Sequence, residues 1–304
     1  MTIDNSIFKD LDKMGKHEAI EKLHTLYSAV EDTITRIKIL QKLNELQDST
    51  HFEEIENYFI SDEDSDVRIE AAKLLAFNYN TKRAKAIKPL IWVLENEKKN
   101  EIKSTAIRLL VPLALRKEYR NTIIPSFKNI LQTKEDYLKM EIAEALGFLK
   151  ENSAADDLVE MLKSTNNQVR IKAIEALNNL NIFPKTAIPY LLNNLGLESY
   201  DIWRFSFNIL KNKLGEKQFL QHLLKILEDT KKNNDTLSVG YLRRGIIRAL
   251  GEIGNKKAIP SLIHSLKDWH DWVREEAIKA LNIIDPNWKI HYRSLLKKNN
   301  INLK

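Results

Sequence analysis

Residues 251–282 read GEIGNKKAIPSLIHSLKDWHDWVREEAIKALN, and this stretch decides the fold. Its second half places apolar residues four, seven and eight positions after Val273, a spacing that puts them on one face of an α-helix. Pro260 stands in the first half, where a helix would begin, and the first helical turn tolerates proline because its N–H groups have no intrahelical partner. The stretch therefore predicts a helix, a short turn and a second helix.

The same pattern recurs along the chain, at intervals of 31 to 40 residues. Second helices are predicted to start at Val67, Ile102, Leu138, Val169, Ile202, Leu242 and Val273, usually with a basic residue next. A proline precedes four of these starts by thirteen residues, at Pro89, Pro125, Pro189 and Pro260, and we expect each to mark the beginning of a first helix. Fixed self-similarity of this length is typical of repeat proteins.

The Pro-x-Leu helix starts and the Asp-x-x-Val-Arg-x-x-Ala-x-x-Ala-Leu helices resemble the HEAT-repeat family, and most of all the short HEAT-like repeats of the phycobilisome-lyase type. The resemblance implies an all-α, right-handed α-solenoid of about eight helix pairs with a C-terminal capping helix. We expect residues 1–304 to form a single solenoid, with a divergent first pair at 17–47, clear repeats over 51–285, and a cap with a basic tail at 287–304. Residues 229–240 read as a polar insertion in the seventh pair.

The basic residue that follows the predicted start of most second helices has two possible roles. We interpret it as the partner of a turn acid from its own or the neighbouring pair, and contact with phosphate groups is the alternative. Arg68, Arg170 and Arg274 are such residues, and Asp66 and Asp271 are acids placed for the pairing.

Composition and motifs exclude several kinds of chemistry. The chain has no Cys, which rules out disulfides, thiolate zinc sites and cysteine nucleophiles. We find no phosphate-binding glycine loop, no H-E-x-x-H and no G-x-S-x-G, and the seven His are scattered. We therefore expect no catalytic, cofactor-binding or metal-binding residues, no small-molecule cofactor and no enzymatic activity.

A partner would bind where the second helices face away from the core. Offsets 2, 6 and 9 from each start should line the concave side of a solenoid. The candidate partner-binding residues on this face, with two neighbours, are Arg204, Phe205, Asn208, Lys211, Arg244, Arg248, Arg108, Glu141 and Glu144. Mixed charge with an aromatic residue favours a protein partner over nucleic acid, and a solvated face without function is the alternative.

Three hypotheses about function remain. The first is a non-enzymatic protein-binding scaffold or regulator that holds a macromolecular partner in its concave groove. The alternative is nucleic-acid binding, or an alkylpurine-DNA-glycosylase-like activity, on the same groove. The basic tail favours it and the acidic second and fourth pairs count against it. A pigment lyase ranks third, since we identify no chromophore-binding feature.

The expected location is the cytoplasm. The N-terminus lacks an apolar signal segment, and no run of about 18 apolar residues is present, so we expect no membrane contact.

Overall fold

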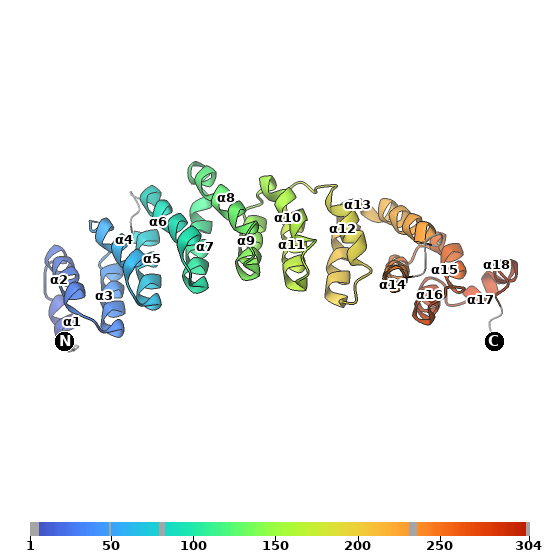
Figure 1. Ribbon diagram of the computed structural model, residues 1–304, viewed down its shortest axis with the longest axis horizontal. Helices are drawn as coiled ribbons and strands as arrows, with labels where there is room; N and C mark the ends of the chain where they lie inside the picture. Colours follow the sequence, from blue (N-terminus) through green and yellow to red (C-terminus); the bar gives the residue numbers. More distant parts are fainter. Residues whose placement is uncertain (1–5, 49, 79–82, 231–235, 302–304) are drawn as a thin grey trace. The chain divides into compact units, whose positions relative to one another are not determined.

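The computed structural model describes residues 6–48, 50–78, 83–230 and 236–301, and it divides the chain into two compact units. The N-terminal unit comprises Met1–Leu149 and the C-terminal unit comprises Lys150–Lys304. Within the described ranges, every regular element is a helix (Figure 1). The fold is therefore all-α, as expected.

In the N-terminal unit the helices are α1 (Ser6–Leu11), α2 (Lys16–Ala29), α3 (Thr33–Glu45), α4 (Phe52–Ser61), α5 (Ser65–Asn78), α6 (Arg83–Asn96), α7 (Asn100–Ala114), α8 (Lys117–Leu131) and α9 (Asp136–Phe148). In the C-terminal unit they are η1 (Asn152–Ala154), α10 (Ala155–Met161), α11 (Asn167–Asn179), α12 (Ala187–Asn194), α13 (Tyr200–Asp229), α14 (Leu237–Ile253), η3 (Lys256–Ala258), α15 (Ile259–Ser265), α16 (Asp271–Ile284), α17 (Trp288–His291) and α18 (Arg293–Lys298).

The helices pack as repeating pairs. In the N-terminal unit α4 packs on α5, α6 on α7 and α8 on α9, while the second helices α3, α5, α7 and α9 pack on one another in succession. In the C-terminal unit α10 packs on α11, α12 on α13 and α15 on α16, with α11, α13, α14 and α16 in succession. Each helix thus buries one face against its pair partner and others against the neighbouring pairs.

The predicted core positions are buried. Val67 and Ala71 in α5 and Val273 and Ala277 in α16 have no exposed surface. The later members of the pattern, such as Leu281, are as deeply buried. The spacing of apolar residues therefore gave the correct inward face of these helices.

Two of the four marker prolines do not begin a helix. Pro189 and Pro260 lie in the first turn of α12 and α15, as expected. Pro89 and Pro125 instead lie well inside α6 and α8, because these helices begin at Arg83 and Lys117. A proline inside a helix removes one N–H donor and crowds the carbonyl of the preceding turn, yet α6 and α8 both continue through it, so these prolines do not mark the first turn.

Helix α13 joins two pairs without a loop. Gly215 interrupts it with φ 72° and ψ 159°, a conformation that residues with a side chain rarely adopt. The residues before Gly215 form the second helix of one pair, and those after it form the first helix of the next. The change from one pair to the next therefore falls at Gly215.

A ladder of ion pairs links successive pairs within each unit. The contacts are Arg36 Nη1 to Asp62 Oδ2 at 2.7 Å, Arg68 to Glu97, Lys103 Nζ to Glu135 Oε1 at 3.1 Å, and Arg243 Nε to Asp268 Oδ2 at 2.6 Å. Each base lies near the start of a second helix, and each acid lies in the turn before the next second helix. Arg68 therefore pairs with Glu97, a turn acid of the neighbouring pair, and Arg274 pairs with Asp271 of its own turn, so both expected arrangements occur.

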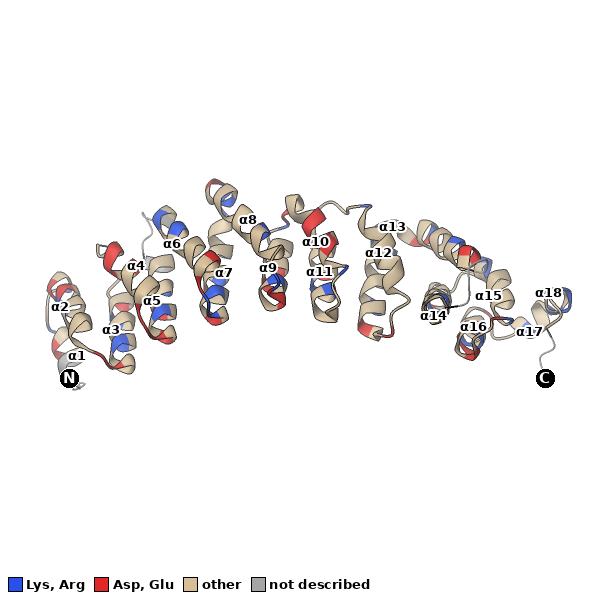
Figure 2. Ribbon diagram, in the orientation of Figure 1, with Lys and Arg blue, Asp and Glu red and all other residues tan. Residues whose placement is uncertain are grey.

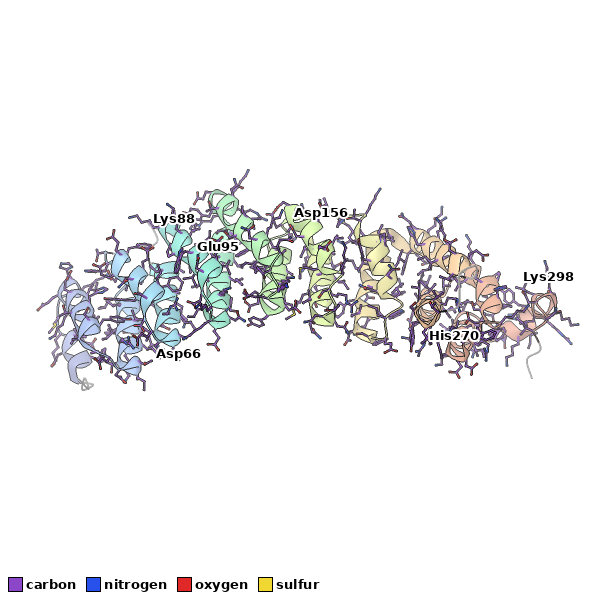
Figure 3. The ribbon with its side chains drawn as sticks, viewed as in Figure 1. Asp66, Lys88, Glu95, Asp156, His270 and Lys298 are labelled. Atoms are coloured by element: carbon purple, nitrogen blue, oxygen red, sulfur yellow. The ribbon has the colours of Figure 1, made fainter. Side chains whose placement is uncertain are left out.

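The ladder's C-terminal contact includes a buried histidine. His270, labelled in Figure 3, has Nδ1 3.4 Å from Asp268 Oδ1.

The expected polar insertion at 229–240 lies partly outside the described residues, which omit 231–235. Asp229 ends α13, and Leu237–Gly240 already belong to α14, so these ends of the segment are helical.

Candidate functional site

Each unit carries a cavity on the exposed side of its second helices. In the N-terminal unit a cavity of about 370 Å³ lies between α7 and α9 and is lined by Ile107, Arg108, Val111, Glu141, Glu144, Ala145 and Phe148. Three of the predicted partner-binding residues, Arg108, Glu141 and Glu144, are thus brought together. The helical projection placed them correctly on one surface.

This N-terminal cavity combines carboxylates with an apolar rim. Phe148 is 62% exposed although it is a large hydrophobic residue. Glu141 accepts hydrogen bonds from Tyr137 Oη at 2.9 Å and from the hydroxyl of Ser104. These bonds orient the Glu141 carboxylate, so the cavity offers a fixed acid beside an exposed aromatic ring.

In the C-terminal unit a second cavity, of about 270 Å³, lies between α13 and α14. It is lined by Leu195, Gly196, Leu197, Glu198, Tyr200, Trp203, Tyr241, Arg244, Gly245 and Arg248. Arg244 and Arg248 were predicted from the sequence, and the aromatic residues around them were not. We call this set the Arg–aromatic pocket.

One buried carboxylate organises both arginines of the Arg–aromatic pocket. Glu276 of α16 is only 8% exposed, with Oε1 3.1 Å from Arg248 Nε and Oε2 3.4 Å from Arg244 Nε. Arg248 Nη2 also donates to Glu276 Oε2 at 3.3 Å. Because a buried acid requires pairing, Glu276 fixes the direction of both guanidinium groups.

The guanidinium of Arg248 also lies over two aromatic rings. It is 5.5 Å from the ring centroid of Trp203 and 5.9 Å from that of Tyr200. The two rings stack with centroids 5.8 Å apart, and Trp203 stacks in turn on Phe207 at 5.1 Å. Arg248 is therefore held by charge on one side and by cation–π contact on the other.

A close approach of two backbones builds the floor of the pocket. A Cβ atom on Gly245 would lie 1.6 Å from the carbonyl oxygen of Leu195, so only glycine fits. The approach lets Trp203 Nε1 donate a hydrogen bond to Gly245 O at 3.0 Å. Trp203 stands where most repeats have a basic residue, and it is buried, so it is a packing residue.

The charges of the pocket largely balance. A hydrogen bond to Glu198 raises the pKa of Tyr241, with the charge of Glu198 acting in the same direction. Glu198 and Glu276 thus face Arg244 and Arg248, two acids against two bases. The pocket is therefore locally neutral, because Glu276 of α16 adds a negative charge that the projection of α14 alone does not include.

The remaining predicted residues lie on α13, outside the pocket. Arg204 is exposed and has Nη2 3.9 Å from Asp201 Oδ1 and its guanidinium 5.5 Å from the Phe205 ring centroid. Lys211 Nζ is 5.7 Å from the ring centroid of Phe207, and Asn208 is exposed. None of Arg204, Phe205, Asn208 and Lys211 lines the Arg–aromatic pocket.

Sequence reasoning missed several residues that the fold places at surfaces of interest. Glu276 follows a repeat start by three positions, an offset with no special meaning in the pattern. Tyr200 lies before the start of its helix pattern. His24, Asp48 and His51 come from three elements of the divergent first pairs, where no motif links them.

The sequence and the fold of this chain are similar to those of known proteins. Residues 87–178, 124–211 and 220–290 match the family of HEAT repeats. The chain therefore belongs to the HEAT-repeat family. This class is defined by the same stacked helix pairs that the structure shows.

Particular relatives follow from two further comparisons. A stretch of 116 residues is 34% identical to the phycocyanobilin lyase subunit alpha of Nostoc sp. strain PCC 7120, covering 38% of this chain and 40% of that protein. The crystal structure of YibA from Escherichia coli is similar over 93% of this chain and 98% of its own, with 18% identity and a TM-score of 0.50. The complex of CpcE and CpcF of phycocyanin lyase from the same Nostoc strain gives 22% identity over 79% of this chain and 95% of the matched chain, with a TM-score of 0.42.

One expectation is overturned by these comparisons. We expected a chain without enzymatic activity, but the relative from Nostoc is a subunit of a lyase, which is an enzyme. The expectation was wrong because it rested on missing catalytic motifs within one chain. A subunit can serve an enzyme without carrying a recognisable motif of its own. The match spans about two fifths of that relative's length.

No helix in the described part of the chain is long and apolar enough to cross a membrane. The cytoplasmic location stays a prediction.

Proposed function

We propose that this HEAT-repeat chain acts as a subunit that binds a protein partner through the Arg–aromatic pocket of its C-terminal unit, with Arg248 as the anchor. The single observation that carries the proposal is the fixing of Arg248 between Glu276 and the rings of Trp203 and Tyr200. Arg, Trp and Tyr are the residues most enriched where binding energy concentrates in protein interfaces.

Preorganisation supports this choice of surface. An arginine that is already held in one direction loses little side-chain entropy when a partner arrives. Arg244 remains 40% exposed, so its guanidinium is accessible to a carboxylate or backbone carbonyl of the partner. The neutral balance of the pocket favours a partner segment with one acidic group among apolar residues over a strongly acidic one.

The cavity of the N-terminal unit offers a second contact of different chemistry. Exposed Phe148 gives an apolar surface, and Glu141 and Glu144 give negative charge. This combination suits a Lys or Arg side chain with an apolar neighbour.

The relative from Nostoc adds a second candidate function. Its name describes a lyase subunit, and a subunit works together with another chain. The 34% identity over 116 residues favours a role for this chain in a lyase-type assembly that handles phycocyanobilin. Mixing the purified chain with phycocyanobilin, with and without the retained partner, and following the absorption spectrum of the pigment tests this candidate.

Nucleic acid fits the described surface less well. A groove for a continuous phosphate backbone should be basic along its length. In Figure 2 acidic and basic residues both occur on the second helices of each unit, and Glu141 and Glu144 face the N-terminal cavity.

The proposal is tested with a pair of arginine variants. The immobilised chain is incubated with nuclease-treated lysate of its source cells, the retained protein is identified, and its affinity is measured after purification. Arg248→Ala should weaken binding at least about 30-fold, as expected for an interface hot spot. Arg204→Ala, on the same exposed side but outside the pocket, should change affinity less than about threefold.

The controls separate binding from folding. Both variants should keep the helical circular dichroism of the wild type. Equal affinity of the Arg248→Ala variant and the wild type would refute the assignment of the pocket. In a parallel incubation without nuclease, retention of nucleic acid in place of a protein, with a steep dependence on salt, would favour the alternative function.

A further inference from the structure

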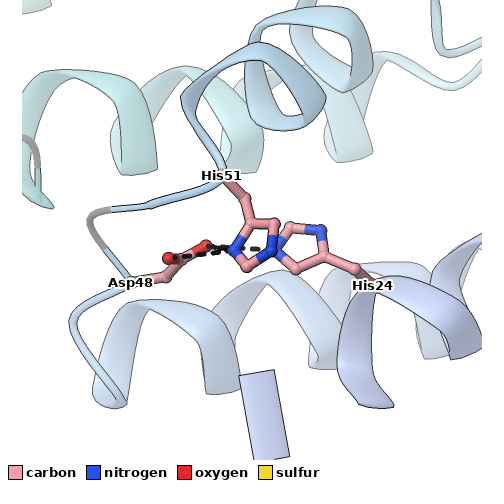
Figure 4. Close-up of side chains that lie close together, drawn as sticks. All are labelled: His24, Asp48 and His51. Carbon is pink, nitrogen blue, oxygen red and sulfur yellow. Dashed lines mark hydrogen bonds and ion pairs between the residues drawn. The ribbon is translucent and has the colours of Figure 1, made fainter. Parts of the chain in front are cut away.

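The N-terminal unit contains a compact group of metal-ligating side chains that line neither of the two cavities. His24 comes from α2, Asp48 from the turn after α3, and His51 from the residue just before α4 (Figure 4). One potential ligand atom from each residue lies within 4.8 Å of the other two. The group is shielded, since Asp48 is fully buried and His24 is 8% exposed.

We propose that His24, Asp48 and His51 form a binding site for a divalent transition-metal ion of the zinc type, with His24 Nε2, His51 Nδ1 and Asp48 Oδ2 as ligands. His24 Nε2 is 3.0 Å and His51 Nδ1 is 3.3 Å from Asp48 Oδ2. Ligands at about 2.0 to 2.1 Å from a tetrahedral zinc ion lie roughly 3.3 Å apart. Two of the three distances between ligand atoms are therefore close to the spacing that the ion requires, and the third is no more than 4.8 Å.

The outer nitrogen of each histidine is occupied by an oxygen atom. His24 Nδ1 lies 3.2 Å from Tyr58 Oη, and His51 Nε2 lies 3.1 Å from Glu21 Oε1. Metal-ligating histidines typically donate their second N–H to such an oxygen, which orients the ring and makes the ligating nitrogen more basic. Both rings show this arrangement.

The two oxygens of Asp48 have divided roles. Oδ1 accepts hydrogen bonds from the backbone N–H and the hydroxyl of Thr50, both at 2.9 Å. Oδ2 lies 3.0 Å from His24 Nε2, and both oxygens lie 3.3 Å from His51 Nδ1. Thr50 can thus hold the carboxylate while Oδ2 binds an ion, and the Thr50 hydroxyl, also 2.9 Å from His51 Nδ1, keeps its bond to Oδ1.

The kinds of atom in the group decide which cation it would take. His51 lies between two carboxylates, with Nε2 3.1 Å from Glu21 Oε1 and Nδ1 3.3 Å from Asp48 Oδ2. Two imidazole nitrogens and one carboxylate suit zinc, whereas Ca²⁺ and Mg²⁺ prefer oxygen ligands.

The site is also placed where an ion can enter. The His51 side chain is 14% exposed, and Glu21 beside it is largely exposed. An ion bound there would join α2 to the start of α4 and so connect the first helix pair to the second. Binding to the folded chain alone would raise its melting temperature.

The test uses the full chain without a polyhistidine tag, freed of metal with a chelator, and ZnCl₂ as the probe. Isothermal titration calorimetry should show one Zn²⁺ per chain at micromolar affinity or tighter, and no binding of Ca²⁺ or Mg²⁺. Asp48→Asn and His51→Gln should each weaken Zn²⁺ binding at least about tenfold, and Glu21→Gln should weaken it about 10- to 100-fold through ring orientation.

A matched control distinguishes this group from an ordinary His–Asp contact. His291 Nδ1 lies 2.8 Å from Asp285 Oδ2, with a single histidine at the contact. His291→Gln should leave Zn²⁺ affinity unchanged. Absence of saturable Zn²⁺ binding by the folded wild type, or undiminished binding in His51→Gln, would overturn the proposal.

A spectroscopic measurement covers the case in which Asp48→Asn does not fold. Co²⁺ added to the metal-free wild type should give the visible absorption of a four-coordinate site with nitrogen ligands. The partly exposed His51→Gln variant should lack this absorption. Identical Co²⁺ spectra for the two proteins would count against the site.

Discussion

Trp203 Nε1 donates a hydrogen bond to the backbone carbonyl of Gly245 at 3.0 Å, and this contact ties α13 to α14 at the floor of the Arg–aromatic pocket. The contact exists because Gly245 lets α14 approach the turn at Leu195 more closely than any side chain would allow. A tryptophan on one helix and a glycine on the next therefore form a matched pair. Variants of these two residues test the contact.

Gly245→Ala should destabilise the chain by about 3 kcal/mol or more, because the new Cβ would meet the Leu195 carbonyl oxygen and the backbones must separate. Urea unfolding followed by circular dichroism measures the change. Gly15→Ala is the control, since a Cβ at Gly15 would meet nothing within 4 Å, and its cost should stay below about 1 kcal/mol. Equal stability of the two variants would contradict the close approach.

Trp203→Phe should cost about 1 to 2 kcal/mol, since the ring stack is largely kept but the donor to Gly245 is lost. Trp269→Phe makes the same chemical change at a side chain that is 81% exposed, and we expect an effect within about 0.5 kcal/mol. Thermal melts of both proteins provide the comparison. A larger loss in the Trp269 variant would argue against this role of Trp203.

The ion pair between Arg68 and Glu97 should make stability depend on pH. Burial raises the pKa of Glu97, but hydrogen bonds from the Lys99 and Lys98 N–H groups, together with Arg68, outweigh it and lower the pKa below its ordinary value. The folded pKa is thus below the unfolded one, so the stabilisation is present above the unfolded pKa and is lost as pH falls through the folded pKa.

Glu97→Gln should remove that part of the acid dependence. Melting temperatures between about pH 3 and pH 7 should converge for the variant and the wild type at the acidic end and differ near neutrality. A constant difference across this range would show that the charge of Glu97 does not contribute.

Phe148→Ala should separate stability from binding in the N-terminal unit. Because the side chain is 62% exposed, its loss should change the unfolding free energy by less than about 1 kcal/mol. Affinity for the retained partner should fall about tenfold or more if the partner covers the cavity. Unchanged affinity would restrict the interface to the C-terminal unit.

The fold was predictable because the second helices repeat one spacing of apolar residues. The apolar spacing after Val67 and Val273 predicted which side chains are buried, since periodicity depends on one helix at a time. The first turn of α6 was not predictable from Pro89, because a proline can occupy a later position as well as the first.

The candidate site was predictable only in part, for a physical reason. Arg244 and Arg248 lie on the predicted face of α14, but the charge around them depends on Glu276 of another helix. Contacts between helices depend on register and distance, which a single helical projection does not contain. The group of His24, Asp48 and His51 is invisible for the same reason, as its members meet only after two helices and a turn have packed.

The ladder of ion pairs has a consequence for how such a chain can evolve. The contacts Arg36–Asp62, Arg68–Glu97 and Lys103–Glu135 place a base and an acid at equivalent positions of successive pairs. If a repeat were duplicated or deleted, the pairs brought together would therefore form an equivalent contact. The contact between Trp203 and Gly245 is not interchangeable in this way, because it needs a tryptophan on α13 and a glycine at the matching position of α14. Repeats can thus be gained or lost in the ladder, whereas the pairs that hold the Arg–aromatic pocket must be inherited together.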